Sequence, residues 1–363
     1  MLLCPHCHSE SYIKKGFDKN TGKQRYRCTS CKRRFVNPIE AQKQPDGYII
    51  KGQSRLYDED GNIKLTWEKT DRKAQAIADS LREVVEAMKS EIVPVQPKEQ
   101  PYGNYIEQLM NVYVITDYHL GMMAWGEETG DDWDLQIAED MLVNWFQSAI
   151  KSSPDASTAV LANIGDFLHW DGFDAVTPAS KHVLDADTRF QKLIRVAIRV
   201  LRHVISLLLD KYEYVHILMC DANHDQASEA WLRELFASMY EIEPRVTVDN
   251  SADTYYCVEH GNVSLFFHHG HKRKVGNIDT VFASKFREVF GRTEHSYAHM
   301  GHLHSIDVKE TNLMVVEQHR TLAASDAYAS RGGWMSGRDA KVITYHCDYG
   351  EVARATISAK MLL

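Results

Sequence analysis

The sequence contains no run that approaches the roughly 18 apolar residues needed to cross a membrane. Its first residues, MLLCPHCHSE, also lack the charged and apolar regions of a signal peptide. Both absences lead us to expect a cytoplasmic protein without a membrane partner. The seven cysteines should then stay reduced, which argues against disulfide bonds.

Charge is unevenly distributed along the chain. The 363 residues have a net charge of −8, yet residues 1–44 carry ten Lys and Arg against three Asp and Glu. This head is therefore +7, and the rest of the chain is −15. A small basic head on an acidic body indicates that the head meets an anionic partner.

Four cysteines lie in the head with the spacing C-x2-C-x20-C-x2-C. Two residues between thiolates let both bind one metal ion, and four thiolates leave tetrahedral zinc no open position. We therefore predict one structural Zn²⁺, which should supply most of the folding energy of so short a domain. Its ligands would be Cys4, Cys7, Cys28 and Cys31.

The stretch GKQRYRCTSCKRRF (22–35) resembles the zinc ribbon of insertion-element transposition proteins and many phage proteins. The resemblance implies nucleic-acid binding, and on charge we favour this over a ribbon that docks protein. The rings of Tyr26 and Phe35 could stack on bases or pack internally. The cations that would contact phosphates are Lys23, Arg25, Arg27, Lys32, Arg33 and Arg34.

Residues 45–104 read as a connection between the ribbon (1–44) and a large domain (105–363). Two strand-like runs around DEDGN in 47–71 predict a hairpin. Residues 72–91 carry one apolar stripe at helical spacing, which fits either packing within one chain or a homodimer. The three prolines of 92–104 are typical of a linker.

The large domain repeats one pattern: an apolar, β-prone run that ends in metal-ligand residue types. Helical periodicity over 134–151 and 187–211 separates the first three runs, which predicts a layered α/β fold. Ligands in such folds bind beyond the carboxyl ends of the strands, so the five sets should converge on one edge. These sets are Asp117 and His119; Asp166; Asn223 and His224; His268, His269 and His271; and His302 and His304.

The residue types indicate the chemistry of this edge. Carboxylates, imidazoles and one amide oxygen suit Mn²⁺, Fe²⁺ or Zn²⁺, and the lack of thiolates argues against a second structural zinc. Two ions roughly 3.5–4 Å apart can clamp a phosphate and activate a shared water. We favour Mn²⁺ for this pair.

The ordered blocks D-x-H (117–119), G-D-x-x-H (165–169), N-H-D (223–225), H-G-H (269–271) and G-H-x-H (301–304) resemble the calcineurin-like metallophosphoesterase superfamily. That resemblance implies a layered β-sandwich core flanked by helices. It implies that Asp117, His119 and His304 bind the first metal and that Asp166 bridges. It further implies that Asn223, His269 and His302 bind the second metal, that His224 is the general acid, and that Asp225 orients it.

Three positions depart from the family pattern. Ala222 stands where glycine is usual, and a small residue should still fit. His169 stands where Asp or Asn is common, which leaves its role open and makes Asp171 a substitute. His268 competes with His269; we prefer His269 because it directly precedes Gly270, and His268 should point to the opposite face of its strand.

The substrate is less constrained than the site. The basic ribbon, the cations Lys272 and Arg273 beside the fourth block, and a row of cations along 187–211 favour nucleic acid, although that row fits a solvated helix face better. The combination is similar to the SbcD/Mre11-like nuclease branch, which implies a DNA exo- or endonuclease. Any ATPase partner would be a separate chain. The alternatives are a phosphoesterase for small diesters such as cyclic nucleotides and a non-catalytic zinc-ribbon DNA-binding regulator.

Overall fold

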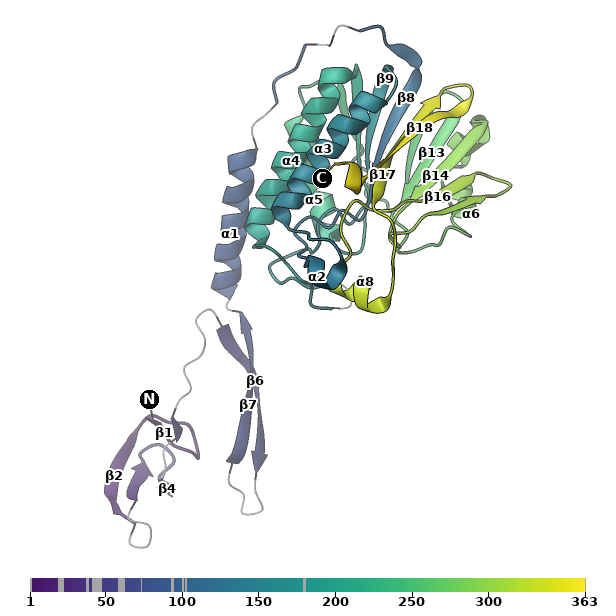
Figure 1. Cartoon of the computed structure of the whole chain (residues 1–363). Helices are drawn as coiled ribbons and strands as arrows, with labels where there is room; N and C mark the ends of the chain where they lie inside the picture. Colours follow the sequence, from purple (N-terminus) through teal and green to yellow (C-terminus); the bar gives the residue numbers. More distant parts are fainter. Residues whose placement is uncertain are drawn as a thin grey trace. The chain divides into compact units, whose positions relative to one another are not determined.

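The chain divides into two compact units, Met1–Arg82 and Glu83–Leu363. The structure is a computed structural model. It describes residues 2–18, 23–36, 39–40, 48–57, 63–72, 74–92, 95–99, 101, 103–178 and 181–362. Figure 1 shows the chain from its N-terminal strands to the yellow C-terminal strands.

The first unit consists of short antiparallel sheets. Strand β1 (Leu2–Leu3) pairs with β5 (Ile39–Glu40), and β3 (Gln24–Cys28) pairs with both β2 (Tyr12–Phe17) and β4 (Arg34–Phe35). Strands β6 (Tyr48–Tyr57) and β7 (Ile63–Arg72) form the predicted hairpin, whose DEDGN turn lies outside the described residues. Helix α1 (Ala74–Glu91) follows and runs across the boundary between the units.

Two sheets form the large unit. The six-stranded sheet has the order β11 (Val246–Val248), β10 (Tyr214–Met219), β9 (Ala156–Asn163), β8 (Ile106–Ile115), β17 (Asp339–His346) and β18 (Gly350–Ser358), and its first four strands are parallel. The five-stranded sheet has the order β12 (Tyr256–His260), β13 (Val263–His268), β14 (His295–Met300), β16 (Val315–Gln318) and β15 (Asp307–Glu310). Within it, β13, β14 and β16 are parallel.

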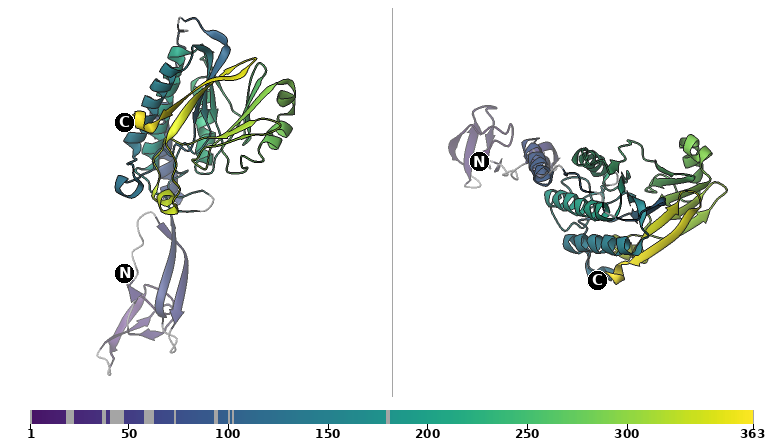
Figure 2. Two further views of the ribbon diagram at one scale, coloured as in Figure 1. Left: turned by 45° about the vertical axis from the view of Figure 1, so that its right-hand side comes forward. Right: turned by 90° about the horizontal axis from the view of Figure 1, so that it is seen from above.

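Four layers result, because each sheet buries one face against the other sheet and one against helices (Figure 2). Helices α3 (Leu135–Ser152), α4 (Phe190–Lys211) and α5 (Gln226–Met239) cover the six-stranded sheet. Helices α6 (Asp279–Lys285) and α7 (Arg287–Arg292) cover the other. Two short helices, α2 (Gly126–Thr129) and α8 (Ala327–Gly332), lie side by side, and a 3-10 turn (Ala359–Met361) ends the chain.

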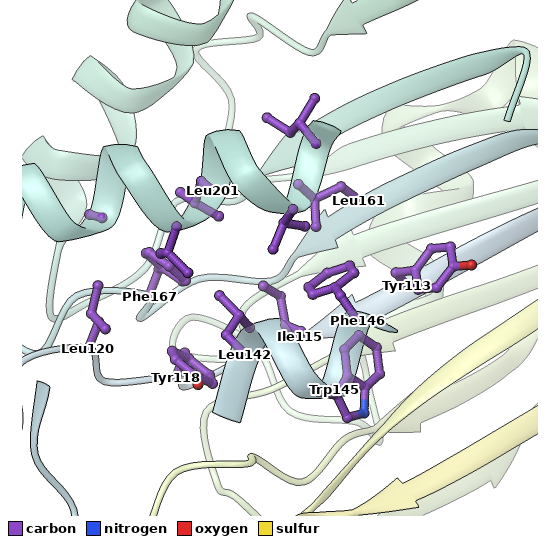
Figure 3. Packing of buried hydrophobic residues seen from close by; sticks show 14 of the residues in the cluster. Tyr113, Ile115, Tyr118, Leu120, Leu142, Trp145, Phe146, Leu161, Phe167 and Leu201 are labelled. Carbon is purple, nitrogen blue, oxygen red and sulfur yellow. The ribbon is translucent and has the colours of Figure 1, made fainter. Parts of the chain in front are cut away.

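Alternation along β8 shows how the layers are held. Tyr113 and Ile115 pack under α3 and α4 with Phe146 (Figure 3), whereas Val112 and Val114 pack between the two sheets. Both sets are almost fully buried. Successive side chains of a strand point to opposite faces of its sheet. A sheet covered on both faces therefore needs apolar residues at successive positions of the strand.

The predicted fold class, a layered α/β sandwich flanked by helices with a small N-terminal domain, is confirmed. The helices expected over 134–151 and 187–211 are α3 and α4. The five apolar runs are all strands, but they belong to two sheets, three to one and two to the other. Among the described residues, none of the helices has the length and apolar character needed to cross a bilayer.

The segment predicted as a linker bonds to the large unit where it is described. The amide of Val95 donates to the carbonyl of Met239, and the amide of Lys98 donates to Glu243 Oε2. The Lys98 ammonium also pairs with Asp210 at 2.6 Å. The domain boundaries at residues 44 and 104 stay predictions.

Replacing Phe146 with alanine tests the helix-facing core. The ring is fully buried and packs against Tyr113 and Trp145 at centroid distances of 5.6 and 4.8 Å. We expect Phe146→Ala to lower the free energy of unfolding by about 3–5 kcal/mol. Tyr214→Ala, at a half-exposed ring, should change it by less than about 0.5 kcal/mol. Urea denaturation measures both, and equal effects would contradict this packing.

Candidate metal centres

The four cysteines of the head converge as predicted. Their sulfurs all lie within 4.8 Å of one another, with Cys4 Sγ 3.8 Å from Cys31 Sγ and Cys7 Sγ 3.4 Å from Cys28 Sγ. Tetrahedral zinc with Zn–S bonds of about 2.3 Å needs sulfurs roughly 3.8 Å apart, so the group fits that ion. Each C-x2-C pair is followed by a residue with positive φ, His8 and Lys32, which closes a tight turn.

The ribbon aromatics pack on the cysteines and on one another. Tyr26 and Phe35 stack at 5.5 Å, and Tyr12 meets both rings edge-on. The small apolar cluster that contains Cys4, Cys28 and Phe35 is formed in this way. Of the two uses predicted for Tyr26 and Phe35, the structure therefore shows packing.

Two of the predicted phosphate contacts in the head have internal partners. Arg25 pairs with Asp18 at 2.9 Å, and Arg27 donates to the Lys32 carbonyl at 3.3 Å. Lys32, Arg33 and Arg34 are exposed, as are Lys272 and Arg273 in the large unit. In the row along α4, Arg199 pairs with Glu139 at 2.6 Å and Arg202 bonds the Glu91 carbonyl, in keeping with a helix face that serves internal contacts.

The second centre lies at one edge of the sandwich. The candidate ligands follow the carboxyl ends of β8, β9, β10, β13 and β14, and parallel pairing within each sheet brings those ends together. Donor atoms of Asp117, His119 and His304 lie within 4.8 Å of one another. The same holds for Asp117, Asp166, His269 and His302. Asn223 joins the second group, with its Oδ1 3.1 Å from His269 Nε2.

The Asp117 side chain is fully buried, and only one of its two carboxylate oxygens accepts hydrogen bonds. Its Oδ2 accepts hydrogen bonds from the Thr116 hydroxyl at 2.6 Å and the His302 amide at 2.8 Å. Its Oδ1 accepts no hydrogen bond and lies 3.2 Å from His304 Nε2. A buried carboxylate oxygen without a donor is costly, and a divalent ion at this position would satisfy it.

Asp166 shows the same division. Its Oδ1 accepts the amides of Asn223 and His224, at 3.1 and 2.8 Å. Its Oδ2 lies 3.0 Å from His269 Nε2, on the side of the other candidate ligands. One oxygen is thus fixed by the backbone before α5, and the other is available to ions, which suits the bridging role predicted for this residue.

Backbone carbonyls fix the imidazoles of this site. His269 Nδ1 lies 2.9 Å from the Ile164 carbonyl, and His224 Nδ1 lies 2.9 Å from the His169 carbonyl. A protonated Nδ1 donates to such a carbonyl, which directs Nε2 and its lone pair at a metal or substrate. His119 Nε2 lies 3.3 Å from His304 Nε2, so two ring nitrogens face each other as ligands of one ion would.

The backbone is strained where the ligands lie. Asp117, His119, Asp166, His302 and His304 all have φ between 48° and 77°. This left-handed region costs most residues of order 1–3 kcal/mol each, so its concentration at one site indicates function. Gly301 makes the closest approach, because a Cβ there would lie 1.9 Å from the Thr116 hydroxyl oxygen.

The electrostatics of the site also favour a bound cation. Burial disfavours a charged His269, yet the Asp166 and Asp117 carboxylates outweigh it and raise the pKa of His269 to about 9. Burial likewise opposes the Asp117 carboxylate, but His304 and His269 hold its pKa below the usual range. A proton on His269 therefore occupies the place that a metal would compete for.

The residues left open by the sequence now have positions. His169 Nδ1 lies 3.3 Å from His119 Nδ1, so His169 contacts the ring of one ligand and holds His224 through its carbonyl. Asp171 accepts from the amides of Ala227 and Ser228 at the start of α5. His268 stacks on Tyr255 and bonds the Thr254 carbonyl, away from the ligand groups.

The predicted orienting residue, Asp225, has other contacts. Its Oδ2 accepts the Leu168 amide at 2.7 Å, and its pKa is raised well above normal by burial and by Glu229. The pKa of Glu229 is raised to about 8, chiefly by burial, and its Oε1 accepts from Asn163. This carboxyl pair ties the loop that carries Asp166 to α5, and the observed partner of the His224 ring is the His169 carbonyl.

One further supporting residue had no sequence signal. Thr321 donates its hydroxyl to the Asp117 carbonyl at 2.7 Å, across 204 positions of sequence. It lies three residues after β16, outside every ligand block.

No family model matches this chain, and no curated protein does. Among solved structures, it is similar to a conserved uncharacterised protein of Streptococcus pneumoniae TIGR4 described as a predicted phosphoesterase (11% identity, 69% of this chain and 98% of that one, TM-score 0.26). It is also similar to zinc-complexed Vps29 of Entamoeba histolytica (10%, 69% and 99%, 0.30) and to an archaeal phosphodiesterase (14%, 68% and 100%, 0.33). These TM-scores are too low to identify a shared fold or function.

Metal binding at the edge site should depend on Asp117. We expect Asp117→Asn to weaken Mn²⁺ binding by more than about tenfold, since second-shell changes alone cost about 10–100-fold. Asp171→Asn alters a carboxylate that caps α5 and should leave Mn²⁺ affinity unchanged. Titration calorimetry measures the Mn²⁺ affinity of the wild type and of both variants. Equal affinity of all three proteins would contradict the assignment of Asp117 as a metal ligand.

The same binding should strengthen as pH rises. Because the raised pKa of His269, about 9, means that the metal must displace a proton below that pH, affinity should increase from pH 6 towards pH 9 and then level off. Calorimetry in two buffers of different ionisation enthalpy would detect the released proton. An affinity that does not change with pH would show that metal binding releases no proton from His269.

The cysteine centre should be required for the head to fold. Cys28→Ser should remove one zinc equivalent per chain, measured by elemental analysis, and expose the amides of residues 24–35 to hydrogen exchange. Cys347→Ser, at a cysteine outside the cluster, serves as the control. Retention of the full zinc content in Cys28→Ser would refute the four-thiolate site.

Proposed function

We propose that this chain is a metal-dependent phosphodiesterase that cleaves nucleic acid, with DNA as the favoured substrate. The observation that carries the proposal is the gathering of seven predicted ligands at one strand edge, five of them on strained backbone. Zn²⁺ would fill the cysteine site, and a pair of divalent ions, with Mn²⁺ favoured, would fill the edge site.

The donor set fits two ions. Asp117, His119 and His304 would hold one, and Asn223, His269 and His302 the other, with Asp166 as the ligand shared by both. Bound there, such ions would polarise a water for attack and offset charge on the phosphate. The orphaned Oδ1 of Asp117 and the facing nitrogens of His119 and His304 support this fit.

The chain's own groups would manage the protons. The ring of His224 lies 4.8 Å from that of His119, and its Nδ1 is occupied by the His169 carbonyl. Its Nε2 is then the free ring nitrogen, and in the doubly protonated imidazolium this atom would give a proton to the departing oxygen. Fixing Nδ1 keeps the ring from turning away between cycles, so His169 would act as a positioning residue for the acid.

Cations near the site support a polyanionic substrate. The pKa of His271 is lowered to about 3, first by burial, then by His269 and His268, and also by the nearby Lys272 ammonium. Lys272 is exposed and therefore able to meet a phosphate that flanks the scissile bond. Exposed Lys32, Arg33 and Arg34 of the head would raise the local concentration of the same polyanion.

Two variants test the proposal on labelled DNA and on bis(p-nitrophenyl) phosphate. His304→Ala should abolish hydrolysis of both substrates while DNA binding through the head persists. Deletion of residues 1–44 should slow DNA cleavage and spare the small diester. His295→Ala, at a histidine that bonds the Asp348 carbonyl, is the matched control and should keep activity. Full DNA cleavage by His304→Ala would defeat the enzyme assignment.

A further inference from the structure

A group of exposed aromatic rings lies on the segments that leave the metal edge. Trp125 precedes α2 and is 57% exposed; Tyr328 and Trp334, at and after α8, are 73% and 59% exposed. We call this region, residues 123–134 and 325–338, the aromatic lobe. The other tryptophans described in the large unit are buried or partly buried, so among them exposed tryptophan is particular to the lobe.

The lobe is one structure. Ser330 Oγ donates to the Glu128 carbonyl, and Arg331 pairs with the Glu128 carboxylate at 2.6 Å. The Tyr328 and Trp334 rings lie 5.2 Å apart, and Figure 1 shows α2 beside α8. Two of the three exposed rings therefore contact each other, and the third directly precedes α2, the helix that lies beside α8.

Both segments that lead into the lobe leave their strands beside Asp117. The first leaves β8 through Asp117 itself and reaches Trp125 eight residues later. The second leaves β16 through Thr321, whose hydroxyl bonds the Asp117 carbonyl, and reaches Tyr328 seven residues later. Both segments that carry the rings are thus anchored beside a candidate metal ligand.

The charges of the lobe do not suit phosphate. Its acids outnumber its bases, and Arg331 and Arg338 pair with Glu128 and Asp131 at 2.6 and 3.0 Å. A polyanion would therefore gain little Coulomb energy here. What the lobe offers is ring faces, and stacking on aromatic rings is how proteins hold unpaired bases without reading sequence.

We propose that the aromatic lobe is a base-stacking subsite that holds unpaired nucleotides beside the scissile phosphodiester. The inference rests on the proposed function and narrows its substrate to strands with single-stranded or unstacked bases. Paired bases present no free faces, so duplex DNA would not engage Trp125 or Trp334 in this way.

The test compares single-stranded oligothymidylate with an abasic oligonucleotide of the same length, which keeps the phosphates and lacks the bases. In a His304→Ala background with Mn²⁺, Trp125→Ala combined with Trp334→Ala should weaken oligothymidylate binding by about tenfold or more. Binding of the abasic strand should not change. The loss should persist at high salt, because stacking is not screened.

Controls separate this result from misfolding and from failure of the proposed function. Trp125→Phe combined with Trp334→Phe should restore binding of oligothymidylate. Tyr214→Ala, at the end of β10 that lies away from the metal edge, should leave this binding intact. Hydrolysis of bis(p-nitrophenyl) phosphate by the double alanine variant in the active background should match wild type. Unchanged oligothymidylate binding, or an equal loss on the abasic strand, overturns the subsite. If the wild type cleaves no diester, the proposed function fails, and the binding comparison still decides the inference.

Discussion

Two buried carboxylates facing several imidazoles are the constraint on which the large unit depends. Asp117 and Asp166 are removed from water, and each keeps one oxygen turned towards ring nitrogens. The two carboxylates also raise the pKa of His269, so the site favours positive charge. Divalent ions satisfy the same oxygens and nitrogens more completely, because every donor can then face positive charge at once.

The rest of the sandwich serves to keep those groups where they are. Left-handed backbone at five ligands persists only if the strands before them cannot relax. The three apolar clusters between the layers of the large unit hold those strands in place. Hydrogen bonds at the edge add direction: Thr116, Thr321 and the amides before α5 each hold one atom of Asp117 or Asp166. Rigid support of this kind keeps a set of metal ligands in a fixed geometry.

The proposed division of labour follows from where charge and aromatic surface lie. Exposed cations of the head would attract phosphates at long range and in a salt-dependent way, whereas the ring faces of the lobe would act only on contact. Such an arrangement would let the head capture a nucleic-acid strand and the lobe position its bases for cleavage. It also gives the acidic surface of the lobe a use, since phosphates are kept from the rings that bases would occupy.

Much of this could be predicted because the signals are local. Cysteine spacing marks a zinc knuckle, apolar runs mark strands, and ligand types at strand ends mark a metal edge, so Cys4, Asp117 and His304 were identifiable from the sequence. What the tertiary structure alone decided is how the runs divide between two sheets, which oxygen of Asp117 stays unpaired, and that Thr321 and the carbonyl of His169 support the site. These depend on contacts between residues as many as 204 positions apart, and no local pattern encodes which distant partner a side chain meets.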